Sequence, residues 1–166
     1  MQLKKFGAKK GAWAVVTGAT DGIGKEFALQ LGKAGFNVLL VARNQSLLSS
    51  VSGEIGRAEY HLYFPLKIEP FSEQKYKVST STHSVDFGKA GDAEYATFAK
   101  VVGDMDVGVL VNNVGKSHSM PAYLVDTPQD EITDIVTINV NGTIRTTYAV
   151  LPGMVQRYEG THDEPA

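Results

Sequence analysis

The apolar positions of this chain follow two alternating patterns. Short, continuous apolar runs at Ala12–Thr17, Phe36–Ala42 and Val107–Val111 each give way to glycine or polar residues. Such runs are typical of strands buried on both faces of a parallel sheet. A further strand is expected at Lys77–Phe87, where β-branched residues are frequent. The pattern therefore predicts four strands.

Between these strands, apolar residues recur at helical spacing. The predicted helices lie at Ile23–Ala34, Leu47–Ile55 and Tyr95–Val102, with a longer one running from Thr127 toward Arg157. Gly35 is expected to end the first helix. Thr127 is expected to cap the last helix, with Pro128 at its first position. Strands that alternate with helices predict a doubly wound α/β fold, whose parallel sheet is covered on both faces.

Three segments fall outside this alternation. Residues 56–72 contain aromatic residues and two prolines without a clear period, and they are too long for an ordinary connection. We interpret them as an extra surface loop, with an untrimmed intron as the alternative. Residues 1–11 carry four lysines, and we expect a solvated basic tail; a juxtamembrane segment is the alternative. Residues 158–166 form a third, divergent tail, which leaves residues 12–157 as the folded domain.

Composition narrows the function classes. The 166-residue chain has a net charge of -2 and 43% hydrophobic residues, as soluble globular domains do, and this charge does not favour a nucleic-acid partner. The absence of cysteine excludes disulfides, thiolate metal sites and cysteine nucleophiles. The four histidines are scattered, so we predict no metal site. No apolar stretch is long enough to span a membrane, so we expect the chain as it stands to be soluble and cytosolic.

The strongest chemical signal is the glycine-rich turn between the first predicted strand and helix. Gly18 permits a tight turn, Gly22 lets the backbone approach a pyrophosphate, and Gly24 allows close helix–sheet packing. The free N–H groups and dipole of the following helix favour phosphate binding. The turn therefore predicts a dinucleotide site formed by Gly18, Thr20, Asp21, Gly22, Ile23 and Gly24.

The end of the second predicted strand indicates which dinucleotide is bound. An NAD site uses a carboxylate there to bind the ribose 2′-hydroxyl. This chain has no acidic residue between Glu26 and Glu54, and it places Arg43 and Asn44 at that point. A guanidinium pairs with a 2′-phosphate, which a carboxylate would repel. We therefore predict NADP(H).

These motifs resemble those of the short-chain dehydrogenase/reductase family. The resemblance rests on the glycine turn, on Ala42-Arg43-Asn44, on Asp86 and on Asn112-Asn113-Val114-Gly115, in which valine replaces the family's alanine. It implies a Rossmann-type fold, of which this chain would supply the first four strands and their flanking helices. By resemblance, Asp86 faces the adenine, and Asn113 and Gly115 border the cofactor. Asn139 matches the asparagine of the family's catalytic tetrad, which holds a water in a proton relay.

A narrower resemblance concerns the substrate. The segments 21–27, 112–119 and 150–155 are similar to the very-long-chain 3-oxoacyl-CoA reductases of this family, especially the fungal ones, and to related 17β-hydroxysteroid dehydrogenases. It implies an NADPH-dependent reduction of long-chain 3-oxoacyl-CoA in fatty-acid elongation, at the endoplasmic reticulum membrane. Membrane association would need an anchor outside this sequence. Steroid substrates, the acyl chain length and the oligomeric state stay open.

The family's catalytic serine, and its tyrosine with a lysine four residues later, are not matched. Among the tyrosines only Tyr63 has a lysine at that spacing, Lys67, but Pro65 lies between them and disfavours a helix. We therefore expect this sequence alone to be inactive, with Val107–Val111 as an unpaired sheet edge. A non-catalytic NADP(H)-binding or interaction fragment, and a non-functional gene product, are the alternatives.

Overall fold

Four parallel strands form the centre of the fold. The computed structural model describes residues 3–57 and 78–160. Within these residues the sheet has the order β3-β2-β1-β4, with β1 at Trp13–Thr17, β2 at Asn37–Ala42, β3 at Thr80–Ser84 and β4 at Val107–Val111. β1 pairs in parallel with both β2 and β4, and β2 pairs in parallel with β3. The predicted α/β class and parallel sheet are confirmed.

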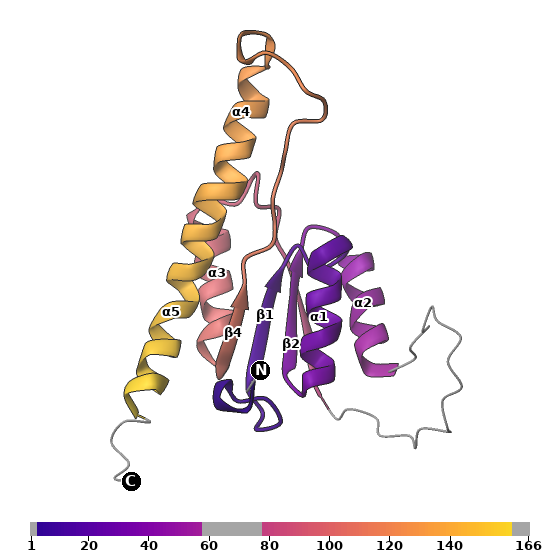
Figure 1. Cartoon of the computed structure of the whole chain (residues 1–166). Helices are drawn as coiled ribbons and strands as arrows, with labels where there is room; N and C mark the ends of the chain where they lie inside the picture. Colours follow the sequence, from indigo (N-terminus) through magenta and orange to yellow (C-terminus); the bar gives the residue numbers. More distant parts are fainter. Residues whose placement is uncertain (1–2, 58–77, 161–166) are drawn as a thin grey trace, which may run out of the picture.

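Helices cover both faces of this sheet (Figure 1). On one face lie α1 (Gly22–Ala34) and α2 (Gln45–Arg57); on the other lie α3 (Asp92–Gly103) and α5 (Thr143–Gly160). Alternate strand residues supply the two cores: Val16 and Leu40 pack toward α1 and α2, whereas Val15 and Leu39 pack toward α3 and α5. This two-sided burial explains why the strands are continuously apolar.

The caps of α1 follow from its flanking residues. Asp21 is the N-cap residue, and its carboxylate accepts a hydrogen bond of 2.7 Å from the backbone N–H of Gly22. Gly35 ends the helix in the left-handed conformation, with φ of 97°. These caps place the start of α1 directly after β1, where a phosphate site would lie.

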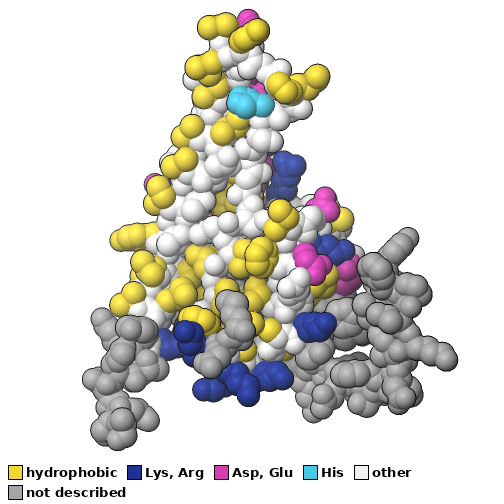
Figure 2. Space-filling model, in the orientation of Figure 1, with side chains coloured by type: hydrophobic (Ala, Val, Ile, Leu, Met, Phe, Trp, Pro, Cys, Tyr) yellow, Lys and Arg dark blue, Asp and Glu magenta, His cyan; other side chains and the backbone are white. Residues whose placement is uncertain are grey.

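One long helical column leaves the sheet and extends beyond it (Figure 1). It consists of α4 (Gln129–Val136), a π-helical segment η3 (Thr137–Gly142) and α5. Apolar side chains lie along this column (Figure 2), including Tyr148 and Leu151 of α5. Within the described residues, β4 pairs only with β1, so the expected open sheet edge is found.

Several boundaries differ from the predictions. β3 is shorter than the predicted strand Lys77–Phe87, because its chain turns at Asp86 to begin a loop. Thr127 is not the cap of α4; that position is Pro128, and the Thr127 hydroxyl donates to the Tyr123 carbonyl instead.

The three outlying segments are only partly described. Residues 56 and 57 of the predicted insert belong to α2, and the rest of it lies outside the described residues. Residues 158–160 of the predicted divergent tail continue α5, and the rest of that tail also lies outside them. Residues 3–11 are not a solvated tail, because their backbone is hydrogen-bonded to the domain. No helix in the described ranges has both the length and the apolar character needed to cross a bilayer.

Candidate cofactor site

A cleft of about 700 Å³ lies at the carboxyl ends of the strands. Ligands of open α/β sheets bind at this edge. The loops after all four strands contribute to the lining, and the α4–η3 column closes one side of it. The lining residues are Gly18, Thr20, Asp21, Ala42, Arg43, Val85, Asp86, Phe87, Gly88, Lys89, Asn113, Val114, Gly115, Lys116, Asp134 and Ile138.

The glycine turn is packed too tightly for side chains. Gly18 has φ of 64°, and a Cβ there would lie 2.8 Å from the side-chain nitrogen of Asn113. A Cβ on Gly24 would overlap the carbonyl oxygen of Gly18 and the Asn113 amide. Gly22 has φ of 52° and open space around it. At Gly18 the turn thus presents backbone to the cleft, next to Thr20 and Asp21.

Thr17 and Asn113 join the ends of β1 and β4 beneath this turn. The hydroxyl of Thr17, which is fully buried, accepts backbone N–H bonds from Asn113 at 3.0 Å and Val114 at 3.1 Å. The Asn113 amide donates to the carbonyl oxygens of Thr17 at 3.1 Å and Gly18 at 3.2 Å. These bonds fix the glycine turn against the loop after β4. Thr17 was not among the predicted cofactor residues, although it directly precedes the first glycine.

Arg43 lies at the rim of the cleft directly after β2. Its side chain is exposed, and its carbonyl accepts a bond of 3.2 Å from the Ser84 hydroxyl of β3. Within the described part of the chain no carboxylate pairs with this guanidinium. The neighbouring Asn44 is outside the lining, and its side chain accepts the Leu47 N–H at 3.1 Å, at the start of α2.

Asp86 shapes the wall of the cleft after β3. Its carboxylate accepts the Gly88 N–H at 3.1 Å, while its carbonyl accepts the N–H groups of Lys89 and Ala90. This turn holds the partly buried carboxylate at the cleft wall.

Asn139 lies in η3 and contacts the loop after β4. Its side chain accepts the Lys116 N–H and donates to the Lys116 carbonyl, both at 2.8 Å. The extra residue of a π-helical turn changes the helical phase at this point, and such turns are frequent at functional sites. Asn139 itself does not line the cleft, but it holds the backbone of Lys116, which does.

Residues 12–161 match the family of short chain dehydrogenases. The chain belongs to this family. It is 63% identical over 158 residues to the very-long-chain 3-oxoacyl-CoA reductase of Coprinopsis cinerea, and 61% identical to that of Laccaria bicolor. Each alignment covers 95% of this chain, which spans about 42% of the length of either relative. A metagenomic short-chain oxidoreductase solved in complex with NADP has a TM-score of 0.71 at 26% identity, covering 92% of this chain and 59% of the other.

In this short-chain dehydrogenase, most predicted cofactor residues reach the cleft. Those that line it are Gly18, Thr20, Asp21, Arg43, Asp86, Asn113 and Gly115; those that do not are Gly22, Ile23, Gly24 and Asn44. Gly24 supports the turn by close packing, whereas the Ile23 side chain is 72% exposed. Tyr63 and Lys67 lie outside the described residues.

Two further charged residues meet in the cleft. The Lys116 ammonium and the Asp134 carboxylate of α4 lie 2.6 Å apart. The hydrogen bond to Asp134 raises the pKa of Lys116. This pair joins α4 to the loop after β4, beside the contact that Asn139 makes. The sequence offered no signal for it, because the two residues are 18 positions apart in an irregular region.

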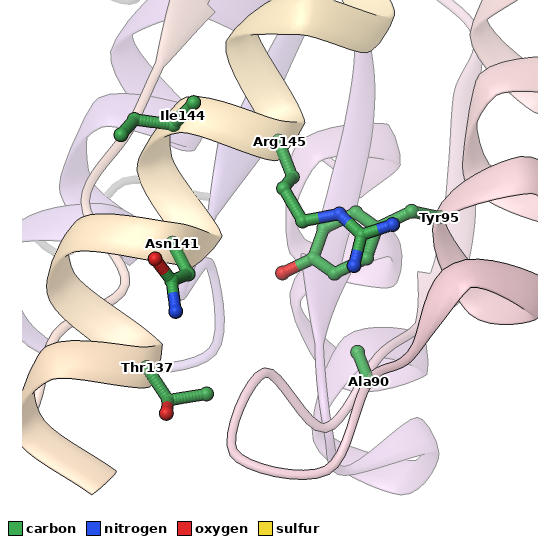
Figure 3. A pocket seen from close by; sticks show the side chains of 6 residues that line it. All are labelled: Ala90, Tyr95, Thr137, Asn141, Ile144 and Arg145. Carbon is green, nitrogen blue, oxygen red and sulfur yellow. The ribbon is translucent and has the colours of Figure 1, made fainter. Parts of the chain in front are cut away.

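A second, smaller cavity of about 210 Å³ lies against η3 and the start of α5 (Figure 3). Arg145 crosses it, with its guanidinium carbon 4.2 Å from the centre of the Tyr95 ring and a nitrogen 2.5 Å from the Asp92 carboxylate. Burial raises the pKa of Tyr95. These contacts connect the turn after η3 to the first turn of α3.

Proposed function

We propose that this chain is the NADP(H)-binding part of a very-long-chain 3-oxoacyl-CoA reductase. The observation that carries the proposal is the cleft at the carboxyl ends of the strands, which combines the tightly packed glycine turn with Arg43 at the end of β2. The relatives of this name, which are more than 60% identical, support the acyl-CoA substrate class. We propose the complete reduction of a 3-oxoacyl-CoA only for a protein that has the full length of these relatives.

Each part of the cleft fits one part of the cofactor. The turn from Gly18 to Asp21, beside the start of α1, suits the pyrophosphate, and Arg43 suits the 2′-phosphate. Asp86 suits the amino group of the adenine, because a carboxylate accepts hydrogen bonds. NADPH, when bound, supplies the hydride for the 3-oxo group. The chain's own residues bind and orient it, and Asn139 holds the loop at Lys116 in place for the reaction.

The first test measures cofactor affinity and preference. NADPH is titrated into the purified chain, and binding is followed by the fluorescence of the reduced nicotinamide. NADPH should bind saturably and more tightly than NADH. The fluorescence of Trp13 is a poor reporter of binding, because this residue begins β1 at the amino ends of the strands, whereas the cleft lies at their carboxyl ends. Arg43→Ala should weaken NADPH binding about 10- to 100-fold, because a hydrogen bond to a charged group contributes roughly 1.5–3 kcal/mol. NADH binding should be unchanged.

Lys100→Ala provides the matched control, because this exposed cation lies on α3, outside the cleft. Equal affinity for NADPH and NADH, or equal losses in the Arg43 and Lys100 variants, would contradict the assignment of the 2′-phosphate site.

A non-catalytic NADP(H)-binding role is the second candidate. It is favoured by Asn139, whose side chain is bonded to the backbone of Lys116 and does not line the cleft. The two candidates differ in one assay: oxidation of NADPH on addition of a long-chain 3-oxoacyl-CoA supports the reductase, and saturable NADPH binding without oxidation supports the binding role.

A further inference from the structure

The amino-terminal lysines belong to a folded segment. Its 3₁₀ helix η1 (Leu3–Phe6) is followed by Ala8, whose side chain is only 2% exposed, and by Lys9, whose N–H donates to the Gly35 carbonyl at 2.8 Å. The Phe6 carbonyl packs so closely on Gly108 of β4 that no Cβ would fit there. The segment is therefore held against the amino ends of the strands.

Four lysines project from this segment into solvent. We call Lys4, Lys5, Lys9 and Lys10 the lysine platform; all four side chains are exposed. Among the described residues, none of these ammonium groups forms an ion pair. Two carboxylates, Asp104 and Asp106, precede β4 at the same end of the sheet, and Asp106 pairs with Arg157 instead. The platform thus carries uncompensated positive charge.

An aromatic side chain lies within the platform. The Phe6 ring is 41% exposed, and the Lys5 ammonium lies 5.1 Å from its centre. Lysines around an exposed aromatic ring suit a lipid interface, where the ring enters the headgroup region and the ammonium groups meet phosphates. A nucleic-acid duplex would use the charges but not this apolar group, because its bases are already stacked on one another.

We propose that the lysine platform docks this domain on an anionic lipid surface. Lys and Arg side chains gather at the lower end of the molecule in Figure 2, where Figure 1 shows the indigo segment that contains η1. The cofactor cleft lies at the opposite edge of the sheet, at the carboxyl ends of the strands. A domain docked in this way keeps its cleft open to the aqueous phase, from which a charged dinucleotide arrives. The inference does not depend on the proposed reaction.

Co-sedimentation with vesicles tests this proposal. The purified chain should sediment with vesicles of phosphatidylcholine and phosphatidylserine, but not with phosphatidylcholine alone, and added salt should release it. Each platform lysine removed should weaken binding about fivefold. Lys4→Ala should show this loss, and Lys4→Ala/Lys5→Ala/Lys10→Ala should bind about 100-fold more weakly. Lys100→Ala removes one exposed cation from α3 and should bind like the unchanged chain.

The aromatic group is tested separately. Phe6→Ser keeps every charge and should still weaken binding to the anionic vesicles, whereas circular dichroism should show an unchanged fold. Three results would overturn the proposal: equal binding to neutral vesicles, equal losses in the Lys4 and Lys100 variants, or tighter binding to duplex DNA than to the anionic vesicles.

Discussion

At the scale of single residues, the geometry of the cleft depends on one buried hydroxyl. Thr17 accepts two backbone N–H bonds from the loop after β4, so it fixes the distance between that loop and the glycine turn. Valine has nearly the same shape but cannot accept a hydrogen bond. Both N–H groups would then be left unpaired in a partly buried place, at about 1–3 kcal/mol each.

We therefore expect Thr17→Val to lower the free energy of unfolding by roughly 2–4 kcal/mol. Urea unfolding followed by circular dichroism measures this change. Thr97→Val is the matched control, since that exposed hydroxyl only donates to the Ala93 carbonyl within α3. A loss of similar size in both variants would show that the two N–H bonds to the Thr17 hydroxyl are not the source of the effect.

The sequence predicted the cleft residues that belong to contiguous motifs. Gly18 and Arg43 could be placed because each follows a recognisable strand. Lys116 and Asp134 could not, because their pairing depends on how α4 leaves the sheet, and no local pattern encodes that path. Asn44 was predicted at the cofactor site from its motif. In the structure it lies outside the cleft lining, and its side chain accepts a hydrogen bond from the Leu47 N–H of α2.

At the scale of elements, the π-helical segment η3 is held from both sides. Asn139 attaches it to the loop after β4, and Arg145 attaches the following turn to α3 through Tyr95 and Asp92. Gly142 allows this approach, because a Cβ there would lie 3.2 Å from the Phe87 ring. The π-helical turn is thus fixed by its neighbours on two elements.

Arg145→Met should loosen this segment while keeping the length of the side chain. Loss of the cation–π contact, together with a smaller contribution from the ion pair to the exposed Asp92, removes roughly 1–2 kcal/mol, so amide hydrogen exchange over 137–142 should accelerate about tenfold or more. Lys100→Met, on helix α3 but without these contacts, should leave that exchange unchanged. Unaltered exchange in the Arg145 variant would mean that helix propensity alone maintains η3.

Element boundaries were harder to predict than the elements themselves. The strand Val107–Val111 was predicted to the residue, since its apolar run ends abruptly at Asn112. β3 was predicted too long, because an edge strand with polar residues has no apolar pattern to mark its ends. Thr127 was taken as a cap from its residue type, but the preceding 3₁₀ turn uses its hydroxyl.

At the scale of the whole molecule, the parallel sheet was predictable because alternate residues of the same strands are buried in the two cores. The strands are therefore continuously apolar in sequence. The folded amino-terminal segment was not, because its contacts with Gly35 and Gly108 are distant in sequence. Its lysines suggested a tail by composition alone. Charge composition therefore did not predict that the segment is folded, and only the structure places it opposite the cleft.

Global stability should depend on pH through His83 of β3. Its ring is tilted against that of Phe98 of α3, with 5.8 Å between the ring centres, and burial lowers the pKa of His83 below its ordinary value. The unfolded chain then binds a proton at a higher pH than the folded one. Stability from this residue is fully present above the unfolded pKa of about 6.5, and it declines as the pH falls from there toward the lower folded pKa.

Urea unfolding at pH 7.5 and 5.5, two values on either side of about 6.5, measures this dependence. The unchanged chain should be less stable at the lower pH, and His83→Gln, which cannot titrate, should lose part of that difference. His118→Gln is the control, because His118 is half-exposed and pairs with Glu131 at the surface. If the His83→Gln variant kept the whole pH difference, acid sensitivity would arise from carboxylates elsewhere, and the packing of β3 on α3 would not be its source.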